Sequence, residues 1–302
     1  VDPNGQHGGP ALDNNAANGT YSWTTTAERL QSAGISWKCY QQSDNYGTNV
    51  LEFLRQFIDA PPSSSLYQNA FGISNLFGGG AASDPTMAFE EDCAKGTLPT
   101  VSWIFPTSVA SEHPSFLPAA GAQFVASKIE ALAANPDLWN STVFILNYDE
   151  NDGFFDHVPP ITPPGGTADE FVSLNSPGGT PGGGLPIGSG FRVPAIIVSP
   201  WTVGGYVCSD PFDHTSALRF IERVTGVSEP NISDWRRRTF GDFTAAFQKA
   251  TEPAPSIPAA TASATAAELA YQTAQSKLPL PSFPGQAQTA PVQASGKRPP
   301  IG

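Results

Sequence analysis

Residues 142–157 read TVFILNYDENDGFFDH and join an apolar run to an acidic loop. The run TVFILNY is largely apolar or β-branched on both of its alternating faces, which is typical of a strand buried inside a parallel sheet. A second run of this kind, VPAIIVS at 193–199, predicts another buried strand. The acidic loop therefore follows directly from the clearest strand of the chain.

Predicted strands and helices alternate along the first 250 residues. Strands are expected at 35–40, 100–105, 142–148 and 193–199, and helices at 24–34, 49–58, 119–134 and 213–224. This alternation predicts an α/β fold, with a mainly parallel sheet flanked by helices. In such sheets the active site lies off the carboxyl ends of the strands, so the residues that follow each strand are the first candidates for function.

Composition changes near residue 250. Residues 1–250 are expected to form one domain, whereas residues 251–302 are rich in Ala and Pro. That composition predicts a largely extended or disordered tail, with one short helix near 264–277.

The acidic loop holds four acids and a histidine within nine residues: Asp149, Glu150, Asp152, Asp156 and His157. Carboxylates crowded this closely repel one another, and a bound divalent cation is the usual compensation. A polar turn with its acids in water is the alternative. An EF-hand loop is excluded, because the glycine comes one place early and the twelfth position is Pro160. We predict a metal site with a catalytic neighbour.

The chain has four histidines, and their surroundings differ. His113 lies in Ser-Glu-His-Pro just after the strand expected at 100–105, so it should share the sheet edge with Asp149 and belong to the active site. His157 closes the acidic loop and is either catalytic or a brace for that loop. His214 begins a predicted helix, where it could act in the site or at the helix cap. His7 lies in a glycine-rich loop and is the weakest candidate.

The charge balance excludes some classes of function. The net charge is −12, which argues against nucleic-acid binding because phosphate contacts need a basic face. No apolar run is long enough for a transmembrane helix. Lysine and arginine together number only 15, and sequons begin at Asn18, Asn140 and Asn231. These features favour a secreted or cell-envelope protein.

Two further residue groups carry weaker signals. Cys39, Cys93 and Cys208 can form at most one disulfide, and either one bridge or three free buried thiols fits the sequence. Arg236-Arg237-Arg238 is the only basic run and is expected to be a solvated or salt-bridged surface. The glycine-rich phosphate loop, the nucleophile elbow and the His-Glu-x-x-His zinc motif are absent from the sequence.

Several stretches together match a known family. They are DPNGQHGGP at 2–10, WTTTAERLQSAGISWKCYQQSDNYGTN at 23–49, SEHPSF at 111–116, VFILNYDENDGFFDHVPPITPP at 143–164, GFRVPAIIVSPW at 190–201 and FDHTSALRFIERVTGVSEPNISDWRRRTFGDFTAAF at 212–247. In these stretches the sequence resembles the bacterial phospholipase C and acid phosphatase (phosphoesterase) family, which has an alkaline-phosphatase-like fold.

The resemblance implies hydrolysis of a phosphate ester with a divalent metal ion as cofactor, whether Ca²⁺, Mg²⁺, Mn²⁺ or Zn²⁺. By this resemblance Asp149 and Glu150 are metal ligands and His113 is the active-site histidine. Asp152 would orient a ligand or a phosphate oxygen, and His157 is the remaining catalytic candidate. A metal neutralises charge on the phosphoryl group, and a histidine can protonate the leaving alkoxide.

One departure from the family pattern concerns the N-terminal side. Family members carry a Glu-Asn-Arg-Ser-Phe-Asp-like segment and a nucleophilic Ser or Thr ahead of the stretch that begins here at Asp2. The resemblance therefore implies a fragment whose N-terminal strands and nucleophile lie upstream of this chain.

Three functions remain open on the sequence alone. The first is a phospholipase C that cleaves phosphatidylcholine-like lipids to diacylglycerol and phosphocholine, with possible peripheral contact to a membrane surface. The second is an acid phosphatase acting on small phosphomonoesters, and the third is a non-catalytic exported module or inactive remnant. An aromatic cage for choline could use Trp23, Trp37, Trp103 or Trp201, although core packing is the simpler role for each.

Overall fold

The computed structural model describes residues 18–72, 88–171, 184–202, 206–247 and 262–279. Its elements alternate between helices and short strands, which confirms a mixed α/β fold. His7 lies outside the described residues, as does most of the tail that was expected to be extended or disordered.

The described strands form two separate pairs. β1 (Trp37–Tyr40) pairs in parallel with β2 (Val101–Ile104), whereas β3 (Phe144–Asn147) pairs antiparallel with β4 (Ala195–Val198). The prediction of a mainly parallel sheet is therefore wrong for the second pair. An apolar run indicates that a segment is a strand, but it carries no information about the direction of its partner.

The two strands expected to be most buried are only partly covered. In β3 the three apolar side chains are half-buried and Asn147 is exposed, and in β4 Ile196 is 53% exposed. The prediction that TVFILNY is fully buried is thus wrong for this structure, because the described residues do not cover both faces of the β3–β4 pair.

Helices account for most of the regular structure. Their bounds are α1 Thr26–Ser32, η1 Val50–Phe53, α2 Arg55–Ile58, α3 Ser65–Phe71, α4 Ala88–Lys95, η2 Ser108–Ala110, α5 Pro118–Ala133, α6 Pro136–Trp139, α7 His214–Thr225, α8 Asp234–Thr239, η3 Thr244–Ala246 and α9 Ala262–Gln275. The four helical segments expected before residue 225 are confirmed, the one at 49–58 as η1 followed by α2. The elements that were not predicted are α3, α4, α6, α8, η2 and η3.

Local sequence signals fix several helix ends. Thr25 caps α1 and forms a capping box with Glu28, which satisfies backbone donors at the start of the helix. α7 ends at Gly226, whose φ of +73° is a left-handed conformation that glycine adopts without steric cost.

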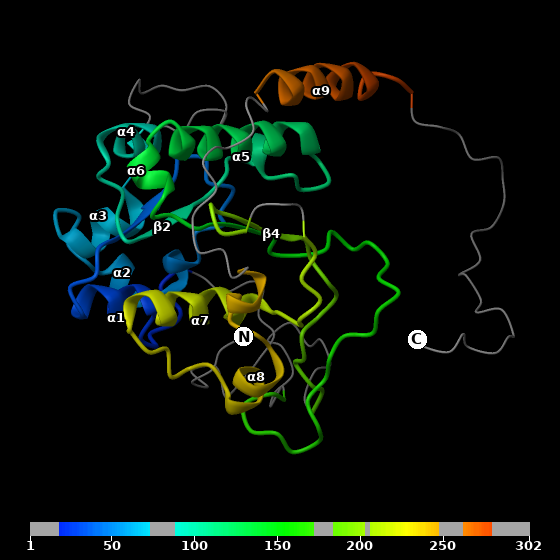
Figure 1. Ribbon diagram of the computed structural model, residues 1–302. Helices are drawn as coiled ribbons and strands as arrows, with labels where there is room; N and C mark the ends of the chain where they lie inside the picture. The colour runs from blue at the N-terminus through cyan, green and yellow to red at the C-terminus, as the bar shows by residue number, and fades with distance from the viewer. Residues whose placement is uncertain (1–17, 73–87, 172–183, 203–205, 248–261, 280–302) are drawn as a thin grey trace, which may run out of the picture.

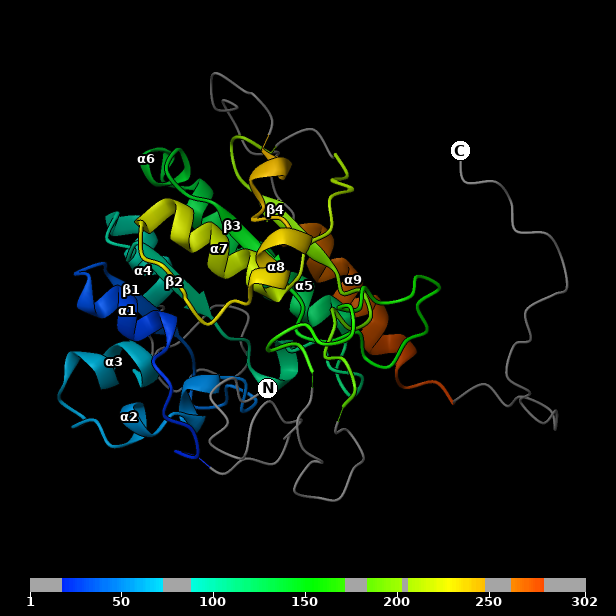
Figure 2. The same ribbon diagram turned by 90° about the horizontal axis from the view of Figure 1, so that it is seen from below.

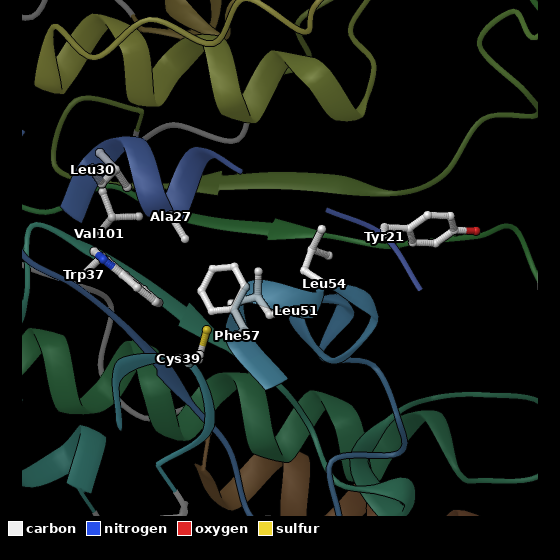
Figure 3. Close-up of a cluster of buried hydrophobic side chains, with 10 residues drawn as sticks. Tyr21, Ala27, Leu30, Trp37, Cys39, Leu51, Leu54, Phe57 and Val101 are labelled. Atoms are coloured by element: carbon white, nitrogen blue, oxygen red, sulfur yellow. The ribbon is translucent and has the colours of Figure 1, made fainter. Parts of the chain in front are cut away.

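The strands lie between two layers of helices (Figure 1), with α4, α5 and α6 on one side and α1, α2 and α7 on the other. One buried cluster lies around β1, where Trp37 packs edge-on against Phe57 with ring centroids 6.3 Å apart (Figure 3). Trp23 and Trp103 pack against the same cluster, so three of the four candidate cage tryptophans serve the core.

The short helix expected near 264–277 is present as α9. It lies along α5 in both views (Figures 1 and 2), and the Ala119 amide donates to Gln272 Oε1 at 3.0 Å. Part of the Ala/Pro-rich region is therefore helical and docked on the α/β body.

The cysteines are all free thiols. Cys39 and Cys93 are buried, whereas Cys208 is exposed. Of the two alternatives left open by the sequence, three free thiols is the one found, but the burial of all three is wrong for Cys208. Within the described segments, no helix combines the length and the apolar character needed to cross a bilayer.

Candidate functional site

Two candidate segments meet at the carboxyl ends of their strands. β3 ends at Asn147 and leads into Tyr148, while the chain after β2 leads through η2 to Glu112. The Tyr148 hydroxyl donates to Glu112 Oε2 at 2.5 Å, across 36 residues of sequence. Burial and the neighbouring carboxylates of Glu112 and Asp152 raise the pKa of Tyr148, so it stays a proton donor in this bond. The bond joins the His113 turn to the acidic loop.

Glu112 is held in an unusual backbone position. Its φ is +61°, a backbone conformation that residues other than glycine rarely adopt. Its side chain lies over Gly121 of α5, where an added Cβ would come within 2.2 Å of Glu112 Cγ. The glycine therefore leaves the space that Glu112 occupies when it accepts from Tyr148.

His113 is partly buried beside two aromatic rings. Its ring centroid lies 5.4 Å from that of Tyr46, and the Tyr46 ring in turn meets Phe116 edge-on. The Nδ1 atom of His113 is buried and has no hydrogen-bond partner among the residues that the structure describes. A buried imidazole nitrogen without a partner is available for a hydrogen bond to a bound ligand.

Asp149 and Glu150 lie side by side at the end of β3. Both are exposed, and the Glu150 amide donates to Asp149 Oδ1 at 3.0 Å. Their carboxylate oxygens are ligands that hard cations such as Ca²⁺ and Mg²⁺ prefer. No group of three His, Cys, Asp or Glu side chains able to hold a metal occurs in the described segments. The pair therefore suits a cation chemically but is not a complete ligand set.

The acidic loop turns at Asp152 and Gly153. Both residues have positive φ, at +53° and +71°, and the Phe154 amide donates to the Asn151 carbonyl at 3.1 Å. Two consecutive left-handed residues favour the Asp-Gly pair found here. The turn keeps Asp152 close enough to influence the Tyr148 hydroxyl.

His157 differs from the other candidates. Its side chain is 81% exposed, and Nδ1 lies 3.9 Å from Asp156 Oδ1. No contact found among the described residues joins His157 to His113 or Tyr148. The structure thus brings together the segments of His113, Asp149, Glu150 and Asp152, and leaves His157 on the outer side of the loop.

An ion pair that the sequence did not indicate fixes the far end of the loop. Arg192 donates hydrogen bonds to the Asp156 carboxylate from Nε at 2.9 Å and from Nη2 at 2.7 Å, and the Arg192 amide donates a third. These donors hold the pKa of Asp156 well below its usual range. The acidic loop is therefore tied to the segment that enters β4.

A third element reaches the site through His214. Asp213 caps α7, and His214 Nε2 lies 3.0 Å from the Tyr148 carbonyl oxygen. The expectation that His214 lies at a helix cap is confirmed in position, although Asp213 makes the cap. Arg236 binds Asp213 Oδ2 at 2.7 Å and Glu170 at 2.9 Å, so a nearly buried ion-pair network supports this helix end.

The basic run is salt-bridged, as expected. Arg237 binds Glu222 at 2.8 Å, and Arg238 lies 3.7 Å from Asp234. Arg236, however, faces inward with a side chain only 16% exposed. Arg236 therefore stabilises the start of α7 beside the site and is not a surface residue like Arg238.

Tyr148→Phe tests the bond that joins the two segments. We expect the free energy of unfolding to fall by about 1–2 kcal/mol, since Glu112 would lose a short hydrogen bond to its carboxylate. Urea unfolding of the chain measures this change. The matched control is Tyr206→Phe, because that side chain is 71% exposed and its loss should cost less than about 0.5 kcal/mol. Equal effects of the two substitutions would contradict the proposed role of Tyr148.

Comparison with known proteins shows the family of the chain. The model of the Phosphoesterase family matches residues 1–228, which include all five candidate site residues. The chain belongs to the phosphoesterase family. It is 41% identical over 318 residues to the non-hemolytic phospholipase C of Pseudomonas aeruginosa, covering 99% of this chain and 44% of the relative.

Two further relatives in the phosphoesterase comparison come from other organisms. Phospholipase C B of Mycobacterium tuberculosis is 41% identical over 269 residues, which cover 85% of this chain and 50% of the relative. Non-specific phospholipase C6 of Arabidopsis thaliana is 29% identical over 204 residues, which cover 61% of this chain and 36% of the relative. The chain spans about half the length or less of the curated relatives it matches.

Proposed function

We propose that this phosphoesterase chain carries part of the active site of a phospholipase C that cleaves phosphatidylcholine-like lipids to diacylglycerol and phosphocholine. The observation that carries the proposal is the Glu112–Tyr148 bond, which joins the segment of His113 after β2 to the segment of the acidic pair, Asp149 and Glu150, after β3. Relatives about 40% identical and named phospholipase C support the substrate class.

Asp149 and Glu150 would contribute two carboxylates to a divalent cation, which when bound neutralises charge on the phosphoryl group. Asp152, whose charge contributes to the raised pKa of Tyr148, would orient the phosphate or a ligand. His113 would give a proton to the diacylglycerol oxygen as its bond to phosphorus breaks. The catalytic role of His157 stays a prediction.

The proposal also includes an alkaline-phosphatase-like sheet and a secreted or cell-envelope location. An alkaline-phosphatase-like sheet would place further strands beside the half-covered β3–β4 pair, which offers partly exposed apolar side chains. A secreted or cell-envelope location fits the sequons, since Asn18, Asn140 and Asn231 are all exposed.

The second candidate is an acid phosphatase acting on phosphomonoesters. The aromatic surroundings of His113 favour the phospholipase, because rings such as Tyr46 and Phe116 can attract the quaternary ammonium of choline. We expect the full-length gene product to hydrolyse p-nitrophenyl phosphorylcholine at least about tenfold faster than p-nitrophenyl phosphate, as one cation–π contact suffices for this preference.

The comparison of kcat/KM for these two esters distinguishes the candidates. The opposite preference would support the phosphatase. Turnover of neither ester by a folded sample, with an ordinary far-ultraviolet circular dichroism spectrum, would support a non-catalytic module.

A further inference from the structure

The acidic loop exposes two consecutive aromatic side chains. Phe154 is 76% exposed and Phe155 is 90% exposed, directly after the Asp152–Gly153 turn. The green trace that follows β3 extends away from the packed helices and strands in both views (Figures 1 and 2). Exposed rings of this size lose the favourable free energy of burial, so a pair of them on a projecting loop indicates a partner.

Further exposed apolar side chains lie on segments that are hydrogen-bonded to this loop or continue it. Phe155 and Phe191 each neighbour one end of the Asp156–Arg192 ion pair, and Phe191 is 54% exposed. Ile161 is 40% exposed and lies next to the same segment, because its amide donates to Ser189 Oγ at 3.0 Å. We call this set, Phe154, Phe155, Ile161 and Phe191, the aromatic rim.

The backbone under the aromatic rim is held in place. Asn151 Nδ2 donates to the Phe154 carbonyl at 2.8 Å, and the Val158 amide donates to Asp156 Oδ1 at 3.0 Å. The three bonds from Arg192 to Asp156 fix the same loop to the β4 side. The exposure of the rings is therefore a consequence of a bonded loop conformation.

We propose that the aromatic rim inserts into the surface of a zwitterionic phospholipid layer and so presents the acidic pair to lipid head groups. The inference rests on the proposed function, because Phe154 and Phe155 follow Asp149 and Glu150 in one loop. The net charge of −12 decides the kind of surface, since an anionic layer would repel the protein. Apolar insertion into an uncharged surface does not meet this penalty.

Co-sedimentation with phosphatidylcholine vesicles tests the aromatic rim. The assay contains a chelator, so that no lipid is consumed and binding is measured apart from hydrolysis. We expect the chain to bind these vesicles. The F154S/F155S variant should bind at least about tenfold more weakly, because each substitution removes the favourable free energy of transferring an apolar ring from water into the lipid layer. The matched control is V224S/Y271S, in which the two side chains are 61% and 60% exposed on other elements.

A second measurement reports insertion directly. In Phe155→Trp the indole emission should shift to the blue on adding phosphatidylcholine vesicles and should be quenched by brominated acyl chains. In the full-length gene product the same shift is expected, and its absence there would mean that other parts of the protein cover the aromatic rim.

Several outcomes would overturn the inference. They are binding equal in wild type and F154S/F155S, stronger binding to phosphatidylglycerol vesicles than to phosphatidylcholine, and a dimer that F154S/F155S abolishes, which would make a second copy the partner. Vesicle binding without ester hydrolysis would uphold the aromatic rim and refute the proposed enzyme. Hydrolysis of a soluble ester without vesicle binding would do the reverse.

Discussion

Asp149→Asn is expected to reduce kcat/KM for p-nitrophenyl phosphorylcholine at least about 100-fold in the full-length gene product. Partners outside the first coordination sphere already change metal affinity or activity by about 10–100-fold, and a direct ligand should cost more. The substitution removes a negative charge from an exposed carboxylate and leaves its size nearly unchanged. The fold should therefore remain intact while the proposed cation loses a ligand.

Asp234→Asn is the matched control for this loss. Asp234 is also exposed, at 89% of its side chain, and it lies on α8 away from β3. We expect kcat/KM of the Asp234→Asn variant for the same ester to stay within about twofold of the wild-type value, as for other surface substitutions. Comparable losses in both variants would show that net charge, rather than the acidic pair, governs the rate.

Arg236→Met is expected to lower the free energy of unfolding by about 3–5 kcal/mol, because it leaves buried charges unpaired. Glu170 and Asp213 have side chains only 1% and 3% exposed, and both are bound by this guanidinium. Arg236 Nη2 also donates to the Gly188 carbonyl at 2.9 Å. The substitution thus removes the link between the segments around Glu170 and Gly188 and the start of α7, where His214 contacts the Tyr148 carbonyl.

Two variants make this prediction specific. Arg238→Met changes the same residue type on the same helix, but its side chain is 71% exposed and should cost less than about 0.5 kcal/mol. R236M/E170Q should recover part of the lost stability, because it neutralises one of the two buried carboxylates. Urea unfolding measures all three variants, and equal costs for the Arg236 and Arg238 changes would contradict the network.

Local sequence signals predicted the position of the strands well. The run TVFILNY contains β3, and VPAIIVS contains β4. Their antiparallel direction could not be read, since pairing direction depends on the path of a connection of 47 residues between Asn147 and Ala195. The helix α4 was missed because it follows a Ser- and Gly-rich stretch that pointed to a loop.

The site was predicted as a set of strand ends rather than as contacts. His113 and the acidic pair were expected at one edge, and the Glu112–Tyr148 bond now joins their segments. Neither that bond nor the Asp156–Arg192 pair could have been predicted from local pattern, because each spans 36 residues. The exposure of His157 could not be predicted either, because the sequence does not show that the Asp156 side chain is covered while that of His157 faces solvent.

Hydrolysis of p-nitrophenyl phosphorylcholine by the full-length gene product, measured before and after addition of a chelator, tests the proposed metal-dependent site directly. The proposed site, made of the joined segments of Asp149, Glu150 and His113, hydrolyses phosphate esters with a divalent cation. We therefore expect that turnover is lost with the chelator and returns when excess divalent cation is added. Turnover that is unaffected by the chelator and unchanged in Asp149→Asn would contradict the proposed site.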